Sequence, residues 1–379
     1  MPVPARARDW LALCLAPGIG ARRAARLNEG LGGPLAWVGA SDKALADCGL
    51  PATAMRALRH PDNTQIDACL DWLKPGHHWL VTLDDELYPP LLRQIDDPPP
   101  CLFLAGDPGL LVRPQVAIVG SRGATRGGLD HAADFAATLA RAGFTVTSGL
   151  AAGIDARAHE GCLGAGGPTI AVIGTGPDII YPARNKPLAL EIVKQGAIVS
   201  PFPPGTQPRP GNFPARNRLI SGMSLGTLVV EASLRSGSLI TARLASEQGR
   251  EVFAIPGSTH NPQARGCHAL IKQGARLVEG AEEIVEALAP LAEELAGSLK
   301  ALLDLDQPAD LDKSETVPHM EEDADYRALL DAIGYDPTPI DQIIGRSELT
   351  TAQVSSMLLI MELDGRITAH PGGRYSRSA

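Results

Sequence analysis

The sequence VAIVGSRGATRGG, from Val116 to Gly128, begins with a short apolar run and continues into a loop of small residues. The run has the length of a buried strand, and a helical pattern follows it to Arg141. Such a loop presents backbone N–H groups at a helix N-terminus, where an anion binds well. Arg122 adds a guanidinium to it. We interpret it as a phosphate-binding loop; the alternative is a tight turn with a solvated arginine.

This loop lacks the signatures of the common nucleotide sites. Its glycines do not have the GxGxxG spacing of a dinucleotide site, and the GK[ST] of a P-loop is absent. The next strand pattern ends at Ser148, without the acidic residue that would hold a ribose hydroxyl. The sequence therefore favours an anion other than a bound dinucleotide.

Strand and helix patterns alternate on both sides of this loop. The strand patterns are Val116–Val119, Thr145–Thr147, Thr169–Ile173, Ala197–Val199, Thr227–Val230 and Glu251–Ile255. The helical patterns are Gly128–Arg141, Ile154–Leu163, Lys186–Gln195, Phe213–Ser221, Leu239–Gln248 and Ala264–Gln273. This alternation predicts an α/β fold, an extended Rossmann-like doubly wound parallel sheet. Ligands bind such sheets beyond the carboxyl ends of the strands, where this chain has mostly Gly, Ser, Pro and Arg.

Other patterns flank the sheet domain, which we place at residues 79–288. Residues 1–78 are helical in pattern, and the turn Leu15–Gly20 is typical of a helix-hairpin-helix or SAM-like domain. That turn either contacts phosphate or serves packing alone. Prolines between Trp79 and Leu111 indicate an extended connector with an edge strand at Cys101–Ala105.

The C-terminal part reads as an acidic linker, residues 289–323, and a winged-helix domain, residues 324–379. The domain has helical patterns at Tyr326–Ile333, Pro339–Ile344 and Thr350–Leu363, followed by two strands around a Gly-Gly turn. The third helix would be the recognition helix, yet it holds no Lys or Arg. We therefore expect a protein contact or weak DNA binding from this domain.

Charge and cysteine usage narrow the class of protein. The net charge is −9, but residues 115–285 carry 16 basic and 12 acidic groups, a net of +4. Six cysteines without a CxxC pair predict reduced thiols. The sequence contains no run of about 18 apolar residues, so we expect no membrane-spanning segment. The N-terminus is a poor signal peptide. We expect a cytoplasmic protein with a mildly basic sheet domain, which is compatible with nucleic-acid binding.

The sequence NFPARNR, from Asn212 to Arg218, lies in a window without acidic residues between Glu191 and Glu231. Phe213 could stack on a nucleobase beside Arg216 and Arg218, an interaction that suits single strands. The alternative is that Phe213 anchors a helix to the core while the arginines are merely exposed.

We find no motif for catalysis or for a metal or cofactor. Asp155 and His159 are spaced i,i+4 and could share a metal ion, but a third ligand is missing. An ion pair or a contact near the helix start is the favoured interpretation.

Together these stretches resemble the DNA-processing protein A family, called DprA or Smf. The similarity lies in VAIVGSRGAT, TSGLAAGIDARAHEG, AVIGTGPDIIYPARN, SPFPPGTQPRPGNFPARNRLISGMS, GTLVVEASLRSGSLITARLASEQGREVFAIPGS and RGCHALIKQGA. The resemblance implies a protein without catalytic activity that binds single-stranded DNA during natural transformation, shields it, and helps to load the RecA recombinase. It also implies a homodimer formed through the sheet domain, around Arg265–Ala275.

The resemblance implies a DNA site in a basic pocket of the sheet domain. The GSR arginine is Arg122, the stacking aromatic is Phe213, and its basic partners are Arg216 and Arg218. Arg209 is the nearest candidate for the basic residue that precedes NFP in the family. The full expected set is Gly120, Ser121, Arg122, Gly149, Arg209, Asn212, Phe213, Arg216, Asn217, Arg218, Ser236 and Gly237.

Two alternatives remain open. SGMSLGTLVVEA, from Ser221 to Ala232, resembles the PGGxGTxxE signature of nucleotide phosphoribohydrolases, in which Glu231 would be catalytic and a nucleoside monophosphate the substrate. Ser221-Gly222-Met223 departs from Pro-Gly-Gly, which weakens that match. The other alternative is a winged-helix transcription regulator with the sheet as sensor, which must explain a recognition helix without basic residues.

Overall fold

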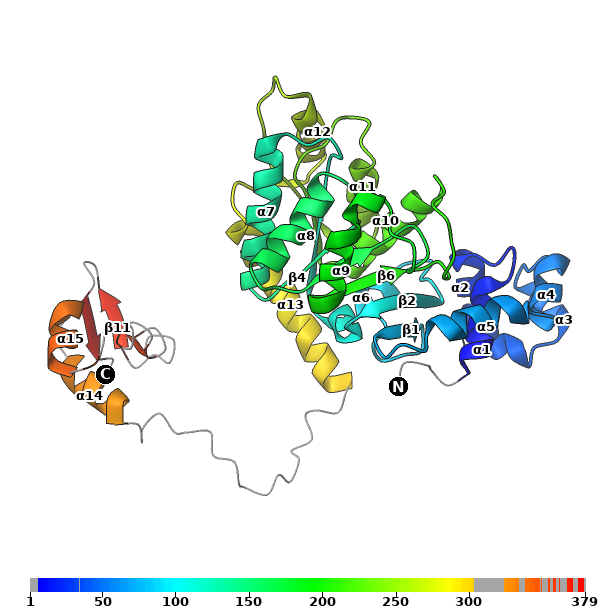
Figure 1. The fold of residues 1–379 in the computed structure, drawn as a ribbon, viewed down its shortest axis with the longest axis horizontal. Helices are drawn as coiled ribbons and strands as arrows, with labels where there is room; N and C mark the ends of the chain where they lie inside the picture. Colours follow the sequence, from blue (N-terminus) through cyan, green and yellow to red (C-terminus); the bar gives the residue numbers. More distant parts are fainter. Residues whose placement is uncertain are drawn as a thin grey trace. The chain divides into compact units, whose positions relative to one another are not determined.

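The computed structural model describes residues 6–33, 35–302, 324–333, 338–347, 349, 354, 357, 358, 361, 367–370 and 374–377. The chain forms two compact units, Met1–Asp304 and Leu305–Ala379 (Figure 1). The first unit contains a helical segment and a large sheet. Among the described residues, no helix is both long and apolar enough to cross a membrane.

The sheet has nine strands in the order β1-β2-β6-β5-β4-β3-β7-β8-β9. They are β1 (His78–Thr82), β2 (Cys101–Gly106), β3 (Gln115–Val119), β4 (Thr145–Ser148), β5 (Thr169–Val172), β6 (Ala197–Ser200), β7 (Gly226–Val229), β8 (Glu251–Ala254) and β9 (Arg276–Leu277). Within the set β3 to β9, all neighbouring strands are parallel. The chain runs outward from β3 to β6 and then returns to add β7 on the other side of β3. The order therefore reverses between β3 and β7, and such a switch point leaves a crevice for a ligand.

The prediction of an extended connector between Trp79 and Leu111 is wrong. β1 pairs antiparallel with β2, and β2 pairs antiparallel with β6, so this segment extends the sheet by two strands. β2 consequently lies inside the sheet and not at its edge. The prolines flank the two strands without entering them, and the run Leu102–Leu104 is fully buried. Proline content alone misled the prediction because proline breaks a strand only from within.

Helices cover both faces of the sheet (Figure 1). They are α7 (Arg126–Arg141), α8 (Ile154–Gly164), α9 (Lys186–Gln195), α10 (Asn212–Met223), α11 (Ser238–Glu247), α12 (Arg265–Lys272) and α13 (Glu282–Leu302). Side chains of β3 alternate between two cores: Val116 and Ile118 pack with α7 and α8, and Ala117 and Val119 with the core that includes α10. α13 continues to Leu302, so residues 289–302 of the expected linker are helical. Residues 303–323 lie outside the described part.

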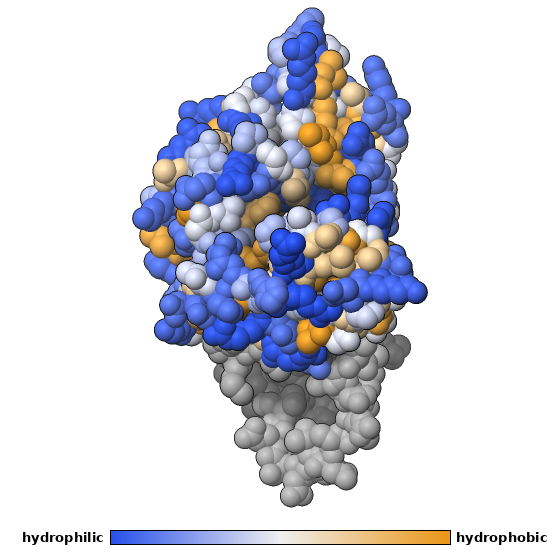
Figure 2. All heavy atoms as spheres, turned by 90° about the vertical axis from the view of Figure 1, so that its right-hand side faces the viewer, coloured by the Kyte–Doolittle hydropathy of each residue, from blue (hydrophilic) through white to orange (hydrophobic). Residues whose placement is uncertain are grey.

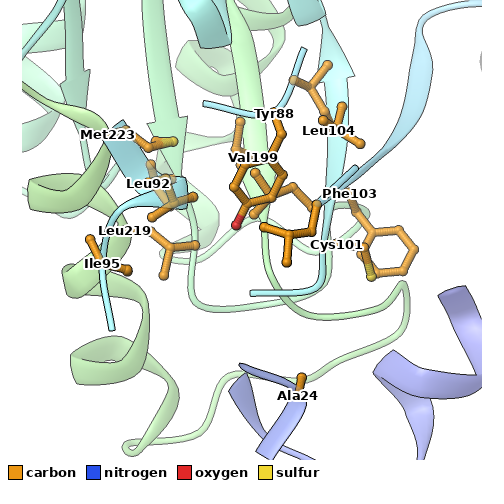
Figure 3. Packing of buried hydrophobic residues seen from close by; sticks show 14 of the residues in the cluster. Ala24, Tyr88, Leu92, Ile95, Cys101, Phe103, Leu104, Val199, Leu219 and Met223 are labelled. Carbon is orange, nitrogen blue, oxygen red and sulfur yellow. The ribbon is translucent and has the colours of Figure 1, made fainter. Parts of the chain in front are cut away.

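The helical segment comprises α1 (Ala7–Leu15), α2 (Ala21–Leu31), α3 (Asp42–Asp47), α4 (Ala52–Arg59) and α5 (Asn63–Trp72). Its core residues, including Ala24, belong to the same cluster as Phe103 and Leu219 of the sheet domain (Figure 3). Around them Tyr88, which is fully buried, donates a hydrogen bond from Oη to the carbonyl of Pro99 (2.8 Å). The helices and the sheet are thus packed as one body, which agrees with a single compact unit.

Two cysteines correct the expectation of six thiols. Cys14 of α1 and Cys101 of β2 form a disulfide across 87 residues of sequence. The pair carries no spacing signal, because only the tertiary packing of α1 on β2 brings the two together. Cys48, Cys69, Cys162 and Cys267 are free thiols.

The second unit contains α14 (Ala324–Ile333), β10 (Thr338–Pro339), α15 (Ile340–Ser347), β11 (Ile367–His370) and β12 (Arg374–Arg377). β12 pairs antiparallel with both other strands, and β11 and β12 form the expected wing. Most of the third expected helix, Thr350–Leu363, lies outside the described residues. Its described members, Val354, Met357, Leu358 and Met361, are helical and buried at the spacing of one apolar face.

Candidate nucleic-acid interface

A cavity of about 430 Å³ opens at the switch point between β3 and β7. Eight of the twelve expected site residues line it: Gly120, Ser121, Arg122, Phe213, Arg216, Asn217, Ser236 and Gly237. Other polar residues of its wall were not in the expected DNA-binding set: Asp155, Ser233, Ser238, Thr241 and Gln263. The loops after β3 and β7 and the first turns of α10 and α11 thus meet at one place.

Glu231 holds the loop after β3 at both of its ends. Its carbonyl accepts from the Ser121 N–H (2.7 Å), and its carboxylate accepts from Thr125 N (2.8 Å) and Thr125 Oγ1 (2.6 Å). Thr125 in turn caps α7 by accepting from the N–H of Gly128 (3.1 Å). A Cβ on Gly128 would lie 2.5 Å from the Glu231 carboxyl carbon, so the close approach requires glycine. The loop that carries Arg122 is therefore fixed in place before any ligand binds.

These contacts bear on the phosphoribohydrolase alternative. The Glu231 carboxylate also accepts from Asn261 Nδ2 (3.3 Å), and Glu231 is not among the residues that line the cavity. Its side chain is buried, at 7% exposure. The carboxylate that a hydrolase would need at its substrate is occupied in a structural network, so this geometry gives that alternative no support.

Arg122 and Phe213 come together at the mouth of the cavity. The exposed Arg122 guanidinium carbon lies 6.0 Å from the centroid of the Phe213 ring. The ring is half-buried over Gly174, where a Cβ would approach its Cδ1 to 3.0 Å. The ring of Tyr181 lies 5.7 Å from the Phe213 ring, centroid to centroid, at an angle of 44°. A cation and two aromatic rings therefore share one surface.

Arg216 forms the floor of the cavity, whereas the sequence placed it at the surface beside Phe213. It is 4% exposed and donates hydrogen bonds to the carbonyls of Gly149 (2.7 Å) and Val172. Burial lowers the pKa of its guanidinium to about 10, and the nearby Asp155 opposes that shift. Its Nε has no hydrogen-bond partner. The cavity wall thus carries two arginines, Arg122 and Arg216, against one carboxyl, that of Asp155, and this balance suits a polyanion.

Asp155 and His159 do not form the metal site considered from their spacing. Asp155 accepts from the N–H of Ala151 (3.3 Å), a contact near the helix start, and His159 pairs with the Thr169 hydroxyl (2.7 Å). Burial raises the pKa of Asp155, while the charge of Arg216 opposes the shift. Within the described ranges there is no cluster of three His, Cys, Asp or Glu that could hold a metal.

The four remaining expected residues, Gly149, Arg209, Asn212 and Arg218, do not line the cavity. Gly149 lies against Arg216, where a Cβ would come within 2.2 Å of Nη1. Arg209 is exposed on the loop before α10, and its carbonyl accepts from the N–H of Asn212 (3.0 Å). Arg218 is absent from the cavity wall; it forms an ion pair with Asp97 (2.9 Å) and joins α10 to the β1–β2 segment.

The chain matches a sequence profile described as DNA recombination-mediator protein A over residues 79–289, and one described as the DprA winged helix domain over residues 313–373. Protein Smf of Escherichia coli K12 is 44% identical over 322 residues, 84% of this chain and 83% of the relative. DNA processing protein DprA of Streptococcus pneumoniae is 46% identical over 201 residues, 53% of this chain and 71% of the relative.

Two solved structures share the fold. DNA processing protein A of Streptococcus pneumoniae superposes with a TM-score of 0.66 and 35% identity, over 76% of this chain and 98% of that one. DNA processing protein A of Helicobacter pylori, described for its single-stranded DNA binding mode, has a TM-score of 0.51 and 32% identity, over 56% and 96%. Since the sheet-domain profile alone covers more than half of the chain, and a relative above 30% identity is matched over most of its length, the protein belongs to the DNA recombination-mediator protein A family, DprA or Smf.

Proposed function

We propose that this protein binds single-stranded DNA at the cavity between β3 and β7, shields it, and helps to load the RecA recombinase onto it. No chemical step on the DNA belongs to the proposal. The observation that carries it is the Arg122 guanidinium beside the Phe213 ring, above a floor formed by the buried cation of Arg216. The Helicobacter pylori relative, described by its single-stranded DNA binding mode, supports the same ligand class.

The geometry favours a single strand over a duplex. Stacking on Phe213 needs a base whose face is free, and a paired base in a duplex is already stacked on both sides. The cavity, at about 430 Å³, has room for a nucleotide-sized group and not for a double helix. The loop N–H groups and Arg122 suit a phosphate next to that base.

The first prediction concerns Arg122 and Phe213. Each changed to Ala should weaken binding of a labelled oligonucleotide, because one loses a phosphate contact and the other a stacking surface worth about 1–3 kcal/mol. Arg122→Ala should also reduce the dependence of affinity on salt, by about 0.7 in log–log slope for one phosphate of a single strand. Fluorescence anisotropy at several salt concentrations measures both quantities.

Arg141→Ala is the matched control for Arg122→Ala. Arg141 is exposed at the other end of α7, just before β4 begins, and thus at the opposite edge of the sheet. Arg141→Ala removes the same charge far from the cavity and should leave the affinity for DNA and the salt slope nearly unchanged. Equal affinity of the wild-type protein for duplex and single strand, or equal effects of the two variants, would count against the proposal.

The partners are those that the resemblance implies, and they are also proposals. We propose a cytoplasmic homodimer that contacts RecA, with the dimer formed at α12 as the resemblance implies. α11 and α12 border a second cavity of about 660 Å³. Leu234 and Ile240 on its wall are exposed by 60% and 40%, and Figure 2 shows an apolar stretch in the upper part of the molecule. RecA loading is tested by strand exchange on DNA precoated with single-strand-binding protein.

A further inference from the structure

We propose that Tyr181 is a second base-stacking residue, which leads the strand out of the cavity past Phe213, and that Arg184 and Lys186 contact the phosphates beyond it. This inference rests on the proposed binding of single-stranded DNA. It adds a binding surface on the loop between β5 and α9, on which the sequence had indicated no site residue.

Tyr181 is unusual in its exposure. At 48% it is the one aromatic side chain among the strongly exposed large hydrophobic residues of the described chain. Other rings of the first unit, such as Trp10 and Phe253, are fully buried. An exposed aromatic ring in a polar surface is frequent at binding sites, because its face remains available for a partner. Here it adjoins the ring that the proposed function already uses.

The two rings form adjacent and not coplanar surfaces. Their centroids are 5.7 Å apart and their planes meet at 44°. That separation exceeds the ~3.4 Å rise of a stacked strand, so two consecutive bases on these rings would be unstacked from one another. Each base would instead stack on its own ring, which is a common arrangement in proteins that bind single strands without sequence preference.

The loop that carries Tyr181 is held by hydrogen bonds at three places. Thr175 Oγ1 donates to the carbonyl of Ile179 (2.5 Å), and the Asp178 carboxylate accepts from the N–H of Gly205 (2.8 Å). Asn185 Nδ2 donates to the carbonyl of Leu150 (2.8 Å), which ties the loop to the cavity side of β4. A ring already fixed in position stacks on a base with little further loss of conformational entropy.

The charge near Tyr181 suits phosphate. Arg184 and Lys186 follow it by three and five residues, and both are exposed. Neither side chain forms an ion pair or hydrogen bond within the parts of the chain that the structure describes. The nearest acids in sequence are engaged: Asp178 by Gly205, and Glu191 by Lys194 (2.7 Å). One exposed ring is therefore followed in sequence by two exposed cations without ion-pair partners among the described residues.

The competing explanation is that Tyr181 only covers Phe213. Substitutions at Tyr181 separate the two roles, because packing needs volume whereas stacking needs a flat aromatic face. In the full-length protein, Tyr181→Phe should bind single-stranded DNA as the wild type does. Tyr181→Leu and Tyr181→Ala should both weaken binding, by about 5- to 150-fold.

The experiment compares two 20-nucleotide probes, dT20 and an abasic strand of the same length, by fluorescence anisotropy. Tyr181→Ala should lower the affinity for dT20 and leave that for the abasic strand unchanged, since the abasic strand has no base to stack. A double variant, Arg184→Ala with Lys186→Ala, should lower both affinities and reduce the salt slope. Leu190→Ala, an exposed apolar change on α9, is the matched control and should alter neither.

A spectroscopic signature completes the test. In Tyr181→Trp, addition of dT20 should quench fluorescence beyond the change seen in the wild-type protein, because the new indole stacks on a base. If Tyr181→Leu binds like Tyr181→Phe, or Tyr181→Ala weakens both probes equally, the stacking role is overturned while the cavity site stands. If dT20 binds to neither the wild type nor any variant, the proposed function itself fails.

Discussion

At the scale of single residues, His159 shows how burial fixes a protonation state. The ring is fully buried in α8. The Thr169 hydroxyl donates to the carbonyl of Val146 (2.7 Å), so it accepts from His159 Nδ1–H, and Nε2 has no partner. Burial, aided by the charge of Arg216, lowers the pKa of His159 from 6.5 to about 3. The imidazole is therefore neutral in the folded protein at any ordinary pH.

This state predicts a pH dependence of stability. Between pH 6.5 and about 3 the unfolded chain binds a proton at His159 that the folded chain does not, so the free energy of unfolding falls as pH falls. The contribution is fully present above pH 6.5 and decreases by about 2 kcal/mol at pH 5. Denaturant unfolding at pH 5 and pH 7.5 should show a smaller difference for His159→Asn than for the wild type.

His131→Asn is the control for that measurement, since His131 is exposed on α7. It should preserve the wild-type difference between the two pH values. The comparison uses the difference and not the absolute stability, because His159→Asn also removes packing contacts from the core. If both variants keep the wild-type difference in the free energy of unfolding, a group other than His159 causes the pH dependence.

Arg216 and Arg218 show what the sequence could not tell at this scale. The acid-free window and the aromatic residue indicated one site, and Arg122, Phe213 and Arg216 do line one cavity. However, side chains two positions apart on a helix point to nearly opposite sides. Arg218 therefore turns to Asp97, while Arg216 turns into the sheet. The Asp97 partner is 121 residues away in sequence, and no local pattern announces it.

At the scale of elements, the start of α7 links the proposed DNA site to the stability of the fold. Thr125 both caps the helix and donates to the buried Glu231 carboxylate. Thr125→Val removes both hydrogen bonds and leaves part of that carboxylate unsatisfied. The free energy of unfolding should fall by about 1–3 kcal/mol, and affinity for single-stranded DNA should fall as well, because the Arg122 loop loosens.

Thr125→Ser keeps the hydroxyl and should retain most of both properties, which thermal unfolding and anisotropy measure. Arg122→Ala supplies a further check. In that background Thr125→Val should lower stability but weaken binding little more, because the contact positioned by the loop is already lost. Full additivity of the two effects on affinity would show that Thr125 does not act through Arg122.

The strand pattern of the sheet domain was largely predictable, because buried parallel strands read as short apolar runs between glycines. All six predicted strands appear, from Val116 to Ile255, each within about a residue or two of its expected bounds. β1 and β9 were missed for different reasons. β1 belongs to a proline-rich segment, and β9 has two residues, too few for any periodicity. The disulfide between Cys14 and Cys101 was also missed, because only tertiary packing brings these two residues together.

At the scale of the whole molecule, the apolar groove between α11 and α12 remains to be explained. Three apolar side chains are exposed near this side of the sheet: Leu234 by 60%, Leu277 by 43% and Ile240 by 40%. β9, the edge strand there, pairs over two residues only. A second copy is the occupant that family membership suggests. In a two-fold dimer each patch meets its own copy, so one substitution acts twice on the interface.

Ile240→Asp should therefore yield a monomer if the proposed dimer forms at this groove. Two carboxylates would be buried across the interface, at a cost well above that of a single surface change. Leu190→Asp is the matched control: Leu190 is 57% exposed on α9, which packs on the opposite face of the sheet from α11. Light scattering coupled to size exclusion should find a dimer for the wild type and for Leu190→Asp, and a monomer for Ile240→Asp with unchanged unfolding. A wild-type monomer, or a dimer that Ile240→Asp leaves intact, would contradict the assignment. If Ile240→Asp is instead a monomer that still binds DNA, one cavity binds a strand without its copy.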